Sequence, residues 1–364
     1  MKTNQRLISL DAFRGFTIAS MILVNNPGSW SHVYAPLLHK PWNGITPTDL
    51  IFPFFIFIVG VSIALAYSKR MDAGLPKREM ARKIVWRAVK IFAVGIFLNL
   101  YPEFDFAGLR VAGVLQRIAI VFLACGIVYL YTRWNTQAFI AAFLLLFYWI
   151  AMMFIPTPGY VKPMLEPGAN LAAWIDSWLL PGTMWQKTWD PEGIFSTLPA
   201  VASGITGMLA GKLVLGSKTM EQKIILLFTS GFAAATLGVV WSWHFPLNKA
   251  LWTSSFVLAT SGLASMTWAV SMFLVDHLNY GKYAKPWVIF GSNAIMVYVL
   301  AGLIGYFFYR VKIGGASFQS HFMDFFTGTG TAPKFASLLY ALMYIAILFI
   351  PAVILFRKKI FIKL

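Results

Sequence analysis

One stretch decides the fold class, residues 48–67, which read TDLIFPFFIFIVGVSIALAY. Its single charged residue, Asp49, stands second in the stretch, and the residues that follow are almost all apolar. A helix needs about 20 predominantly apolar residues to cross the hydrocarbon core of a bilayer. We therefore interpret this stretch as a transmembrane helix that enters the membrane near Asp49.

Comparable apolar blocks recur along the whole chain. Hydrophobic residues make up 59% of the 364 residues and charged residues only 12%, against roughly 45–50% and about 25% in soluble domains. We predict an all-α polytopic membrane protein with about ten transmembrane helices, built as one transmembrane domain over residues 1–364. The predicted spans are Ile8–Val24, Thr48–Tyr67, Ile84–Leu100, Val111–Tyr131, Gln137–Phe154, Glu192–Gly211, Ile224–Ser242, Trp252–Val275, Trp287–Tyr309 and Ala336–Phe356.

The basic residues indicate how the chain is oriented. Its formal net charge is +17, a balance that many nucleic-acid-binding proteins share. However, Lys and Arg concentrate in alternate loops, most densely between Lys69 and Lys83 and after Phe356. Cytoplasmic loops of membrane proteins carry this excess, so the charge records topology and we predict no nucleic-acid partner. With an even number of spans, both termini lie on the cytoplasmic side.

Two loops on the predicted outer side, residues 25–47 and 155–191, end in helix-start signals. Thr46-Pro47-Thr48-Asp49 and Asp190-Pro191-Glu192-Gly193 each place a capping residue, a proline and an acidic residue in the order typical of a first helical turn. Capping alone explains Thr46 and Asp190. Asp49 and Glu192 have a second interpretation, because a carboxylate where a helix enters the membrane can bind a cationic amine.

Several charged or amide side chains fall inside predicted spans, where they are costly and are functional candidates by default. Arg14 follows Asp11 by three residues, so a structural ion pair explains it as well as a ligand role does. Gln116-Arg117 has no acidic neighbour in its own helix. Arg117 therefore requires an anion from another helix or from a phosphate-bearing ligand, and we favour the ligand. Ser292-Asn293 interrupts another span and suits hydrogen bonding between helices.

Among the five histidines, His39 stands in the setting best suited to catalysis. It precedes 40–44, a predicted rigid turn of sequence KPWNG that leads directly into the capped second span. A histidine held in such a setting suits a general base, because imidazole changes its protonation state near neutral pH. No two histidines have the helical spacing of metal ligands, and the single cysteine, Cys125, lies in a span. We therefore predict no metal site.

The motifs together resemble those of one known family. The opening run RLISLDAFRG, residues 6–15, resembles the start of the heparan-α-glucosaminide N-acetyltransferase family of transmembrane acyltransferases. The most specific part is the combination of His-x-x-Trp-Asn-Gly at 39–44 with Asp-Leu-x-Phe-Pro at 49–53. Further family-like segments are Val24-Asn25, Gly113–Arg117, Asp190–Gly193 and Ser292-Asn293, so the resemblance covers essentially the whole membrane region.

The resemblance implies a reaction and roles for named residues. Such proteins move an acetyl group from cytosolic acetyl-coenzyme A (acetyl-CoA) to the amine of a glucosamine on the far side of the membrane. His39 matches the active-site histidine and suits the general base, and Asn25 resembles an asparagine of the same site that donates to the oxyanion. An acetyl-His39 intermediate is the alternative route. The expected sugar contacts are Trp42, Asn43, Asp49 and Glu192, and the expected coenzyme contacts are Arg14, Gln116, Arg117, Ser292 and Asn293.

The chain also departs from the lysosomal members of that family. It lacks their long lumenal N-terminal domain, and its loop between Asn25 and His39 is longer, so it looks like a bacterial homologue embedded in the lipid of the inner membrane. The resemblance also implies a homodimer. The natural acceptor stays open, and so do two other functions. These are a solute transporter, which scattered intramembrane polar residues would also serve, and an O-acyltransferase of envelope glycans.

Overall fold

The structure is a computed structural model, and it describes residues 7–362 of the chain. These residues are almost entirely helical, with one short antiparallel hairpin of β1, Lys312–Ile313, and β2, Ala316–Ser317. The α-helices are α1 Ile8–Asn25, α2 Ile51–Asp72, α3 Lys77–Leu100, α4 Val114–Tyr131, α5 Trp134–Phe154, α6 Leu171–Leu179, α7 Thr197–Leu215, α8 Met220–Trp241, α9 Ser254–Ser271, α10 Gly281–Ser292, α11 Ala294–Tyr309, α12 Phe318–Gly328 and α13 Pro333–Arg357. The shorter helical turns are η1 Ala35–Leu37, η2 Pro47–Leu50 and the π-helical η3 Met272–His277.

Most of these helices can cross a membrane. Within residues 7–362, eight are long and apolar enough: α1, α2 together with η2, α4, α5, α7, α8, α9 together with η3, and α13. The α10–α11 pair passes as a ninth, although the two helices are bent by 68° at their break. The prediction of an all-α polytopic membrane protein is confirmed. Which side of the membrane each loop faces stays a prediction.

The remaining predicted span, Ile84–Leu100, falls in α3, which has the length but not the composition of the other spans. Its 24 residues make a helix of about 36 Å at 1.5 Å per residue. Its first half is strongly basic, and Arg87 and Lys90 extend the exposed charge further along it. The Arg87 guanidinium lies 4.8 Å from the centre of the Phe122 ring of α4. The charges of α3 are what separate it from the eight apolar helices.

Two helix starts differ in how well they were predicted. The capping box at Thr46 is present, since Asp49 accepts from the Thr46 N–H (3.0 Å), but it opens the 3-10 turn η2 before α2 begins at Ile51. The expected helix start at Asp190-Pro191-Glu192-Gly193 is wrong, because α7 begins only at Thr197. The Asp190 carboxylate accepts from the Glu192 N–H (2.9 Å), which closes a tight turn and not a helix.

The chain divides into two compact units, and we describe each by itself. The terminal unit comprises 7–40, 46–52 and 271–362 of the described chain. Its helix α1 packs against α10, α11 and α13. A Cβ at Gly15 would collide with the backbone carbonyl of Trp287, and one at Gly291 with that of Asp11. Small residues thus let α1 and α10 approach closely, as is typical of helix pairs in membranes.

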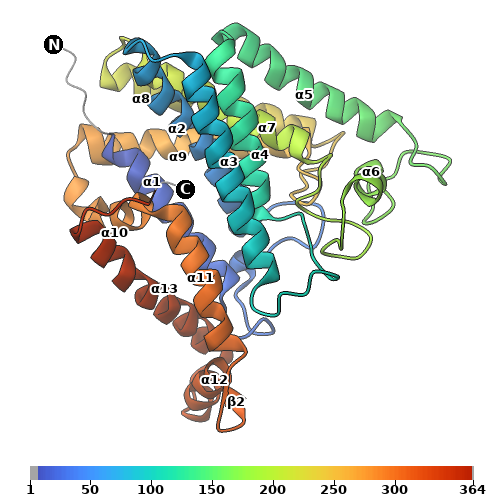
Figure 1. The fold of residues 1–364 in the computed structure, drawn as a ribbon, viewed down its shortest axis with the longest axis vertical. Helices are drawn as coiled ribbons and strands as arrows, with labels where there is room; N and C mark the ends of the chain where they lie inside the picture. The colour runs from blue at the N-terminus through green and yellow to red at the C-terminus, as the bar shows by residue number, and fades with distance from the viewer. Residues whose placement is uncertain (1–6, 363–364) are drawn as a thin grey trace. The chain divides into compact units, whose positions relative to one another are not determined.

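The central unit comprises 41–45 and 53–270. In it α3 and α4 run side by side (Figure 1), and α7 packs against α4, α5 and α8. The loops that follow α5 pack on a buried core, in which Tyr148 and Met152 lie against Leu171 and Phe245. This core supports α6 and the loop segments around it, which carry several of the expected site residues.

Candidate functional site

His39 and Asp49 form a hydrogen-bonded pair in the terminal unit. The imidazole Nδ1 of His39 lies 2.6 Å from Oδ1 of Asp49. The His39 side chain is 43% exposed and the Asp49 side chain only 2%, so a solvent-facing imidazole rests on a buried carboxylate. Because a carboxylate only accepts, Nδ1 carries the proton and Nε2 keeps its lone pair in the neutral ring. Such a pair can act as an oriented base.

The local sequence explains why Asp49 points at His39. Its other oxygen, Oδ2, accepts from the backbone N–H of Lys40 (3.1 Å), the N–H of Thr46 (3.0 Å) and the Thr46 hydroxyl (3.1 Å). The capping box therefore holds the carboxylate in one orientation. The structure places Asp49 behind the imidazole, where its acceptor positions are occupied, and not at an open surface where a substrate ammonium would reach it.

Asn25, the second expected catalytic residue, is the last residue of α1 and is exposed. Its side-chain amide makes no hydrogen bond within residues 7–362, so its donors are available to a ligand. The neighbouring Asn26 behaves differently, because its Nδ2 donates back to the Ile22 carbonyl (2.8 Å). The adjacent amides thus have separate settings, one open and one bound to the helix end. No hydrogen bond joins the Asn25 amide to His39 within the residues that the structure describes.

Trp42 and Asn43, expected sugar contacts, belong to the central unit and have protein partners there. The Trp42 indole N–H donates to the Leu165 carbonyl (3.0 Å), and its ring packs edge-on against Trp189 with centroids 5.0 Å apart. Asn43 accepts from the Asn248 amide (3.1 Å). These contacts hold the WNG turn against three other loops, so structural roles account for both residues.

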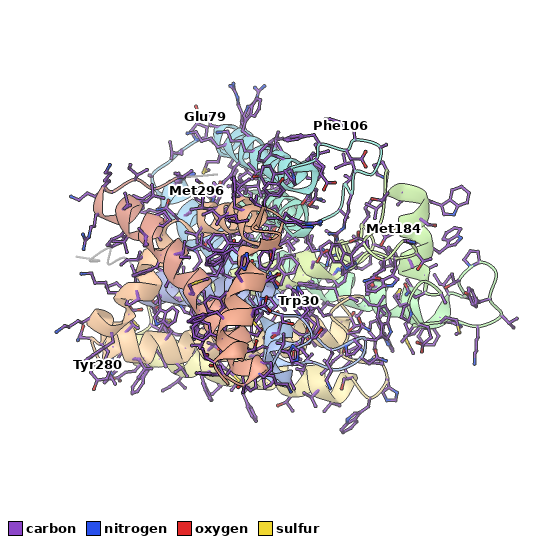
Figure 2. All side chains as sticks on the ribbon, turned by 90° about the horizontal axis from the view of Figure 1, so that it is seen from below. Trp30, Glu79, Phe106, Met184, Tyr280 and Met296 are labelled. Atoms are coloured by element: carbon purple, nitrogen blue, oxygen red, sulfur yellow. The ribbon has the colours of Figure 1, made fainter. Side chains whose placement is uncertain are left out.

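Glu192 takes part in an ion-pair cluster on Arg110. The Arg110 Nε and Nη2 donate to the two oxygens of Asp190 (2.7 and 2.6 Å), and Nη2 also donates to Glu192 Oε2 (2.5 Å). The guanidinium lies 5.1 Å from the centre of the Trp185 ring. A β-bridge from Arg110 to Gly182 joins the same two loops, which Phe106 and Met184 mark in Figure 2.

The cluster shifts the protonation equilibria of its members. Burial alone would lower the pKa of Arg110, but hydrogen bonds and the negative charge from Asp190 and Glu192 outweigh it and raise that pKa. Burial would likewise raise the pKa of Asp190, but Arg110 holds it below its usual range. Both groups therefore stay charged, and Glu192 serves this cluster in the structure rather than standing open to a substrate amine.

Arg117 lies in the first turn of α4 and is fully buried. Its Nη2 donates to the Gly193 carbonyl (3.0 Å) and to the Ser196 hydroxyl, and its guanidinium lies 5.1 Å from the centre of the Trp252 ring. The carboxylates of Glu192, Asp176 and Asp190 lie near enough to interact with its charge. Carboxylates of the protein itself thus offset part of the Arg117 charge, for which the sequence favoured a ligand phosphate.

Arg117 and its neighbour Gln116 nevertheless keep unsatisfied donors. Within residues 7–362, Nε and Nη1 of Arg117 and Nε2 of Gln116 are buried and have no hydrogen-bond partner. Buried polar groups in proteins are normally hydrogen-bonded, to ordered water or a ligand where no protein group serves. The two residues therefore present donors that suit carbonyl or anionic oxygens.

Arg14, Ser292 and Asn293 come together at the break between α10 and α11. Arg14 donates to Asp11 (3.2 Å), which confirms the predicted ion pair, and to the Gly291 carbonyl (3.4 Å). Asn293 donates to the Ile360 carbonyl (3.0 Å) and accepts from the Ile362 N–H (2.8 Å). Ser292 donates to the carbonyl one turn earlier in α10 (2.7 Å). All three side chains hydrogen-bond to protein atoms, and these bonds stabilise the break between α10 and α11.

Asp176 is a site residue that the sequence interpretation missed. It lies on α6 and is buried, and its carboxylate accepts from the Phe195 N–H (3.1 Å). Burial raises its pKa to about 6. One local signal was present, because Asn170 caps α6 by accepting from the Ala173 N–H (2.9 Å). No local signal marks Arg110, whose partner Asp190 lies 80 residues later.

No group of three or more His, Cys, Asp or Glu side chains that could hold a metal ion occurs among the residues that the structure describes. Cys125 is buried as a thiol. The terminal unit offers a histidine–aspartate pair and an exposed asparagine amide, and the central unit offers a buried arginine–glutamine pair with unsatisfied donors.

Comparisons with known proteins identify the family of the chain. A family model described as heparan-alpha-glucosaminide N-acetyltransferase, catalytic, matches residues 6–246. The human heparan-alpha-glucosaminide N-acetyltransferase is 28% identical over 99% of this chain and 60% of its own length, and the mouse protein is 27% identical over 87% and 56%. The chain thus spans less than two thirds of the curated relatives it matches. Because the family model covers more than half of its residues, the chain belongs to the heparan-alpha-glucosaminide N-acetyltransferase family.

Proposed function

We propose that this chain is a membrane-embedded N-acetyltransferase that moves an acetyl group from acetyl-CoA to the amine of glucosamine or a related amino sugar. The observation that carries the proposal is the exposed His39 imidazole on the buried Asp49 carboxylate (2.6 Å), inside the region that the family model matches. The relatives' printed name supplies the reaction class.

His39 acts as the general base. An amine attacks a thioester only when it is unprotonated, so a group beside the acceptor must take its proton. Asp49 fixes the Nδ1–H tautomer, and Nε2 then faces the acceptor with its lone pair. When His39 takes up the proton, the buried Asp49 carboxylate stabilises the imidazolium. The aspartate of hydrolase triads has the same role. We favour this direct transfer over an acetyl-His39 intermediate.

The bonds and charges balance in the direct route. The amine nitrogen forms a bond to the acetyl carbon, the carbon–sulfur bond breaks, and the thiolate leaves. The amine proton passes to His39, which returns it to the thiolate or to water. The Asn25 amide donates a hydrogen bond to the oxygen that becomes negative during attack. The products are an N-acetylated amino sugar and the coenzyme thiol.

Arg117 and Gln116 are the best candidates to hold the acyl-pantetheine arm of the donor. The arm carries amide and thioester carbonyls, which are the acceptors that the vacant Nε, Nη1 and Nε2 donors lack. Arg117 contacts Gly193 and Ser196, just after the predicted outer loop 155–191, so we assign the pair to the acyl end of the coenzyme. We assign Arg14, Ser292 and Asn293 to holding the helix break.

We further propose that the donor is supplied from the cytoplasmic side and the acceptor from the outer side of a bacterial inner membrane, with the protein acting as a homodimer. The lysine and arginine distribution supports the sidedness. Proteoliposomes test it: acetyl-CoA is placed on one side only and glucosamine on the other. Transfer is expected only when the coenzyme has access to the face that bears 69–83.

The decisive experiment uses purified protein in lipid nanodiscs with acetyl-CoA and glucosamine. We expect equal amounts of coenzyme thiol and N-acetylglucosamine, measured by a thiol reagent and by mass spectrometry. Acetyl groups that hydroxylamine removes would identify an O-acyltransferase instead, since esters are cleaved and amides are not. Thiol release without any acetylated sugar would contradict both transferase hypotheses.

The broken α10–α11 pair favours one other candidate function, that of a solute transporter. Discontinuous helices form solute sites in many secondary transporters, and this pair is bent by 68°. Uptake of radiolabelled glucosamine into proteoliposomes, without acetylation and without acetyl-CoA, would favour that function. We expect no uptake, because the Asn293 side chain already binds 360–362 at the break.

A further inference from the structure

The helix α12 packs against α13 in the terminal unit (Figure 1) and is too short to cross a membrane. Its 11 residues make about 16 Å of helix at 1.5 Å per residue. Phenylalanines recur at 318, 322, 325 and 326, a spacing that places side chains on one face of a helix. The polar residues His321 and Asp324 lie away from the centre of that face. The helix is therefore amphipathic, with an aromatic face.

The protein covers only part of this aromatic face. The Phe322 ring lies 5.3 Å from the Tyr340 ring of α13. The Phe318 ring lies 5.0 Å from the Phe308 ring of α11. Phe325 is nevertheless 65% exposed, and Phe318 is 39% exposed. The aromatic face of α12 is thus wider than its contacts with α11 and α13.

Two polar contacts fix the rotation of α12 about its own axis. The Gln319 Nε2 donates to the Gly28 carbonyl (2.5 Å). The His321 Nε2–H donates to the Ile313 carbonyl (2.7 Å) in the hairpin before the helix. Phe325 therefore cannot turn towards the protein unless these bonds break.

The contacts of α12 also place it at one edge of the hydrocarbon layer. The 25 residues of α13 make a helix of about 37 Å, which exceeds the roughly 30 Å thickness of the hydrocarbon core by about 7 Å. Tyr340, on which Phe322 packs, comes seven residues after Pro333, or about 10 Å along the helix. Even if α13 projects by the whole difference at this end, Tyr340 lies inside the core. The helix α12 therefore lies where α13 enters the hydrocarbon.

The lipid-facing surface of α13 continues to this level. Only 28% of the most apolar part of α13 is buried in the protein, so its exposed face, which includes Leu342, contacts lipid. Phe335 precedes Leu342 by two helical turns on the same face and is also exposed. The cations nearest to α12 in the sequence are all exposed and suit the phosphates of lipid headgroups: Arg310, Lys312 and Lys334.

We propose that α12 is an interfacial membrane helix, with Phe318 and Phe325 inserted among the acyl chains of the bilayer and Asp324 facing the headgroups and water. The partner of this surface is the lipid bilayer and not a second copy of the chain. The inference goes beyond the proposed function and does not depend on it. Because Gln319 binds Gly28, the inserted helix also holds the loop that follows α1.

Nitroxide labels on single cysteines test the proposal in the full chain. Cys125 is the only cysteine and is buried, so Cys125→Ser provides a background without a thiol. Labels at Phe325→Cys and Asp324→Cys, which are exposed neighbours, are compared in nanodiscs. Their relaxation is measured with oxygen, which concentrates in lipid, and with a nickel chelate, which stays in water. Leu342→Cys marks lipid, and Lys218→Cys, in an exposed turn, marks water.

We expect the ratio of oxygen-induced to nickel-induced relaxation at 325 to exceed the ratios at 324 and 218 several-fold, and to approach that at 342. Phe318→Cys, on the same face of α12, is expected to behave as Phe325→Cys does, which guards against a local effect of one substitution. Size-exclusion profiles that match the unlabelled protein confirm that each variant is folded.

Three results would overturn the proposal. A ratio at 325 equal to that at 218 would place the aromatic face in water. Protection of 325 from both agents would show that protein covers it, as a second copy of the chain would. Equal, lipid-like ratios at 324 and 325 would show that α12 does not lie at the interface with one face in lipid. None of these readouts requires acetyl transfer, so they do not depend on the proposed enzyme activity.

Discussion

The Nδ1 of His39 lies 2.6 Å from Oδ1 of Asp49, a carboxylate that also accepts from the backbone and hydroxyl of Thr46. This relationship joins a helix-start motif to the proposed catalytic base. The capping box orients the carboxylate, the carboxylate orients the imidazole, and the imidazole presents Nε2 to the acceptor. Each link can be removed separately.

The first prediction concerns Asp49→Asn. An asparagine amide can donate to Nδ1, which favours the opposite tautomer and turns the proton-bearing nitrogen towards the substrate. We expect kcat for acetyl transfer to fall by about 10²–10⁴, the range that general-base catalysis contributes, with KM for the acceptor little changed. Asp105→Asn alters a carboxylate in an exposed loop and is expected to retain full activity. A small change in kcat for Asp49→Asn would mean that the pair is only structural.

The second prediction compares the adjacent amides Asn25 and Asn26. If the Asn25 amide stabilises the oxyanion, Asn25→Ala should lower kcat by about 10²–10³, as loss of one oxyanion donor does in other enzymes. Thermal stability should not change, because this side chain is exposed. Asn26→Ala removes the bond to the Ile22 carbonyl and should lower stability slightly with kcat kept. Equal loss of kcat in the two variants would contradict the assignment.

The third prediction addresses the Arg110 cluster. The Asp190 side chain is fully buried, so Arg110→Met leaves a carboxylate without its main partner. Breaking a buried pair in this way costs about 3–5 kcal/mol of unfolding free energy. Arg110→Met with Asp190→Asn should recover part of that loss. Unfolding titrations of the two single variants and the double variant measure the coupling, and strictly additive losses would show that the pair does not interact.

The fourth prediction concerns pH and Asp176. Burial raises its pKa from 3.8 to about 6, so the folded protein binds this proton more tightly than the unfolded chain does. The resulting stability is fully present below about pH 4 and is lost as the pH rises through about 6, to an extent of roughly 3 kcal/mol at most.

Asp176→Asn stays neutral at every pH and does not undergo this loss. We therefore expect the Tm of the variant to lie within a few degrees of that of the unaltered protein at pH 4, and to exceed it by more at pH 7.5. Glu166→Gln, at an exposed position, should show no such pH dependence. A variant that is less stable at pH 7.5 than at pH 4, relative to the unaltered protein, would show that the ionised carboxylate is favoured.

The spans were predictable because they depend on local composition. Blocks such as 48–67 are long and apolar, and no distant contact is needed to identify them. The exception is α3, predicted as a span, whose basic residues keep it outside the helices that are apolar enough to cross a membrane. The short helices α6 and α12, of 9 and 11 residues, were missed because they are too short to stand out by hydropathy.

In the candidate site only the capping box at Thr46 was predicted from local sequence, whereas Asp49 was assigned to the substrate amine and its pairing with His39 was not predicted. His39 and Asp49 are ten residues apart, and the capping box that aims the carboxylate lies within four residues. Asp190 was misinterpreted as a helix cap because the side chain that holds it, Arg110, comes 80 residues earlier. Arg117 was left in need of an anion for the same reason, since its partners at Gly193 and Ser196 lie 76 and 79 residues along the chain. Residue spacing carries no information about such contacts.

The most direct test of the proposed mechanism is the rate of acetyl transfer by His39→Gln in nanodiscs, measured from pH 5.5 to 9 beside the unaltered protein. Glutamine keeps a hydrogen bond to Asp49 but cannot accept the amine proton. We expect acetylation to fall by at least 10² at neutral pH and to recover partly at alkaline pH, where the amine has already lost its proton. Transfer at the rate and with the pH dependence of the unaltered protein would contradict His39 as the base.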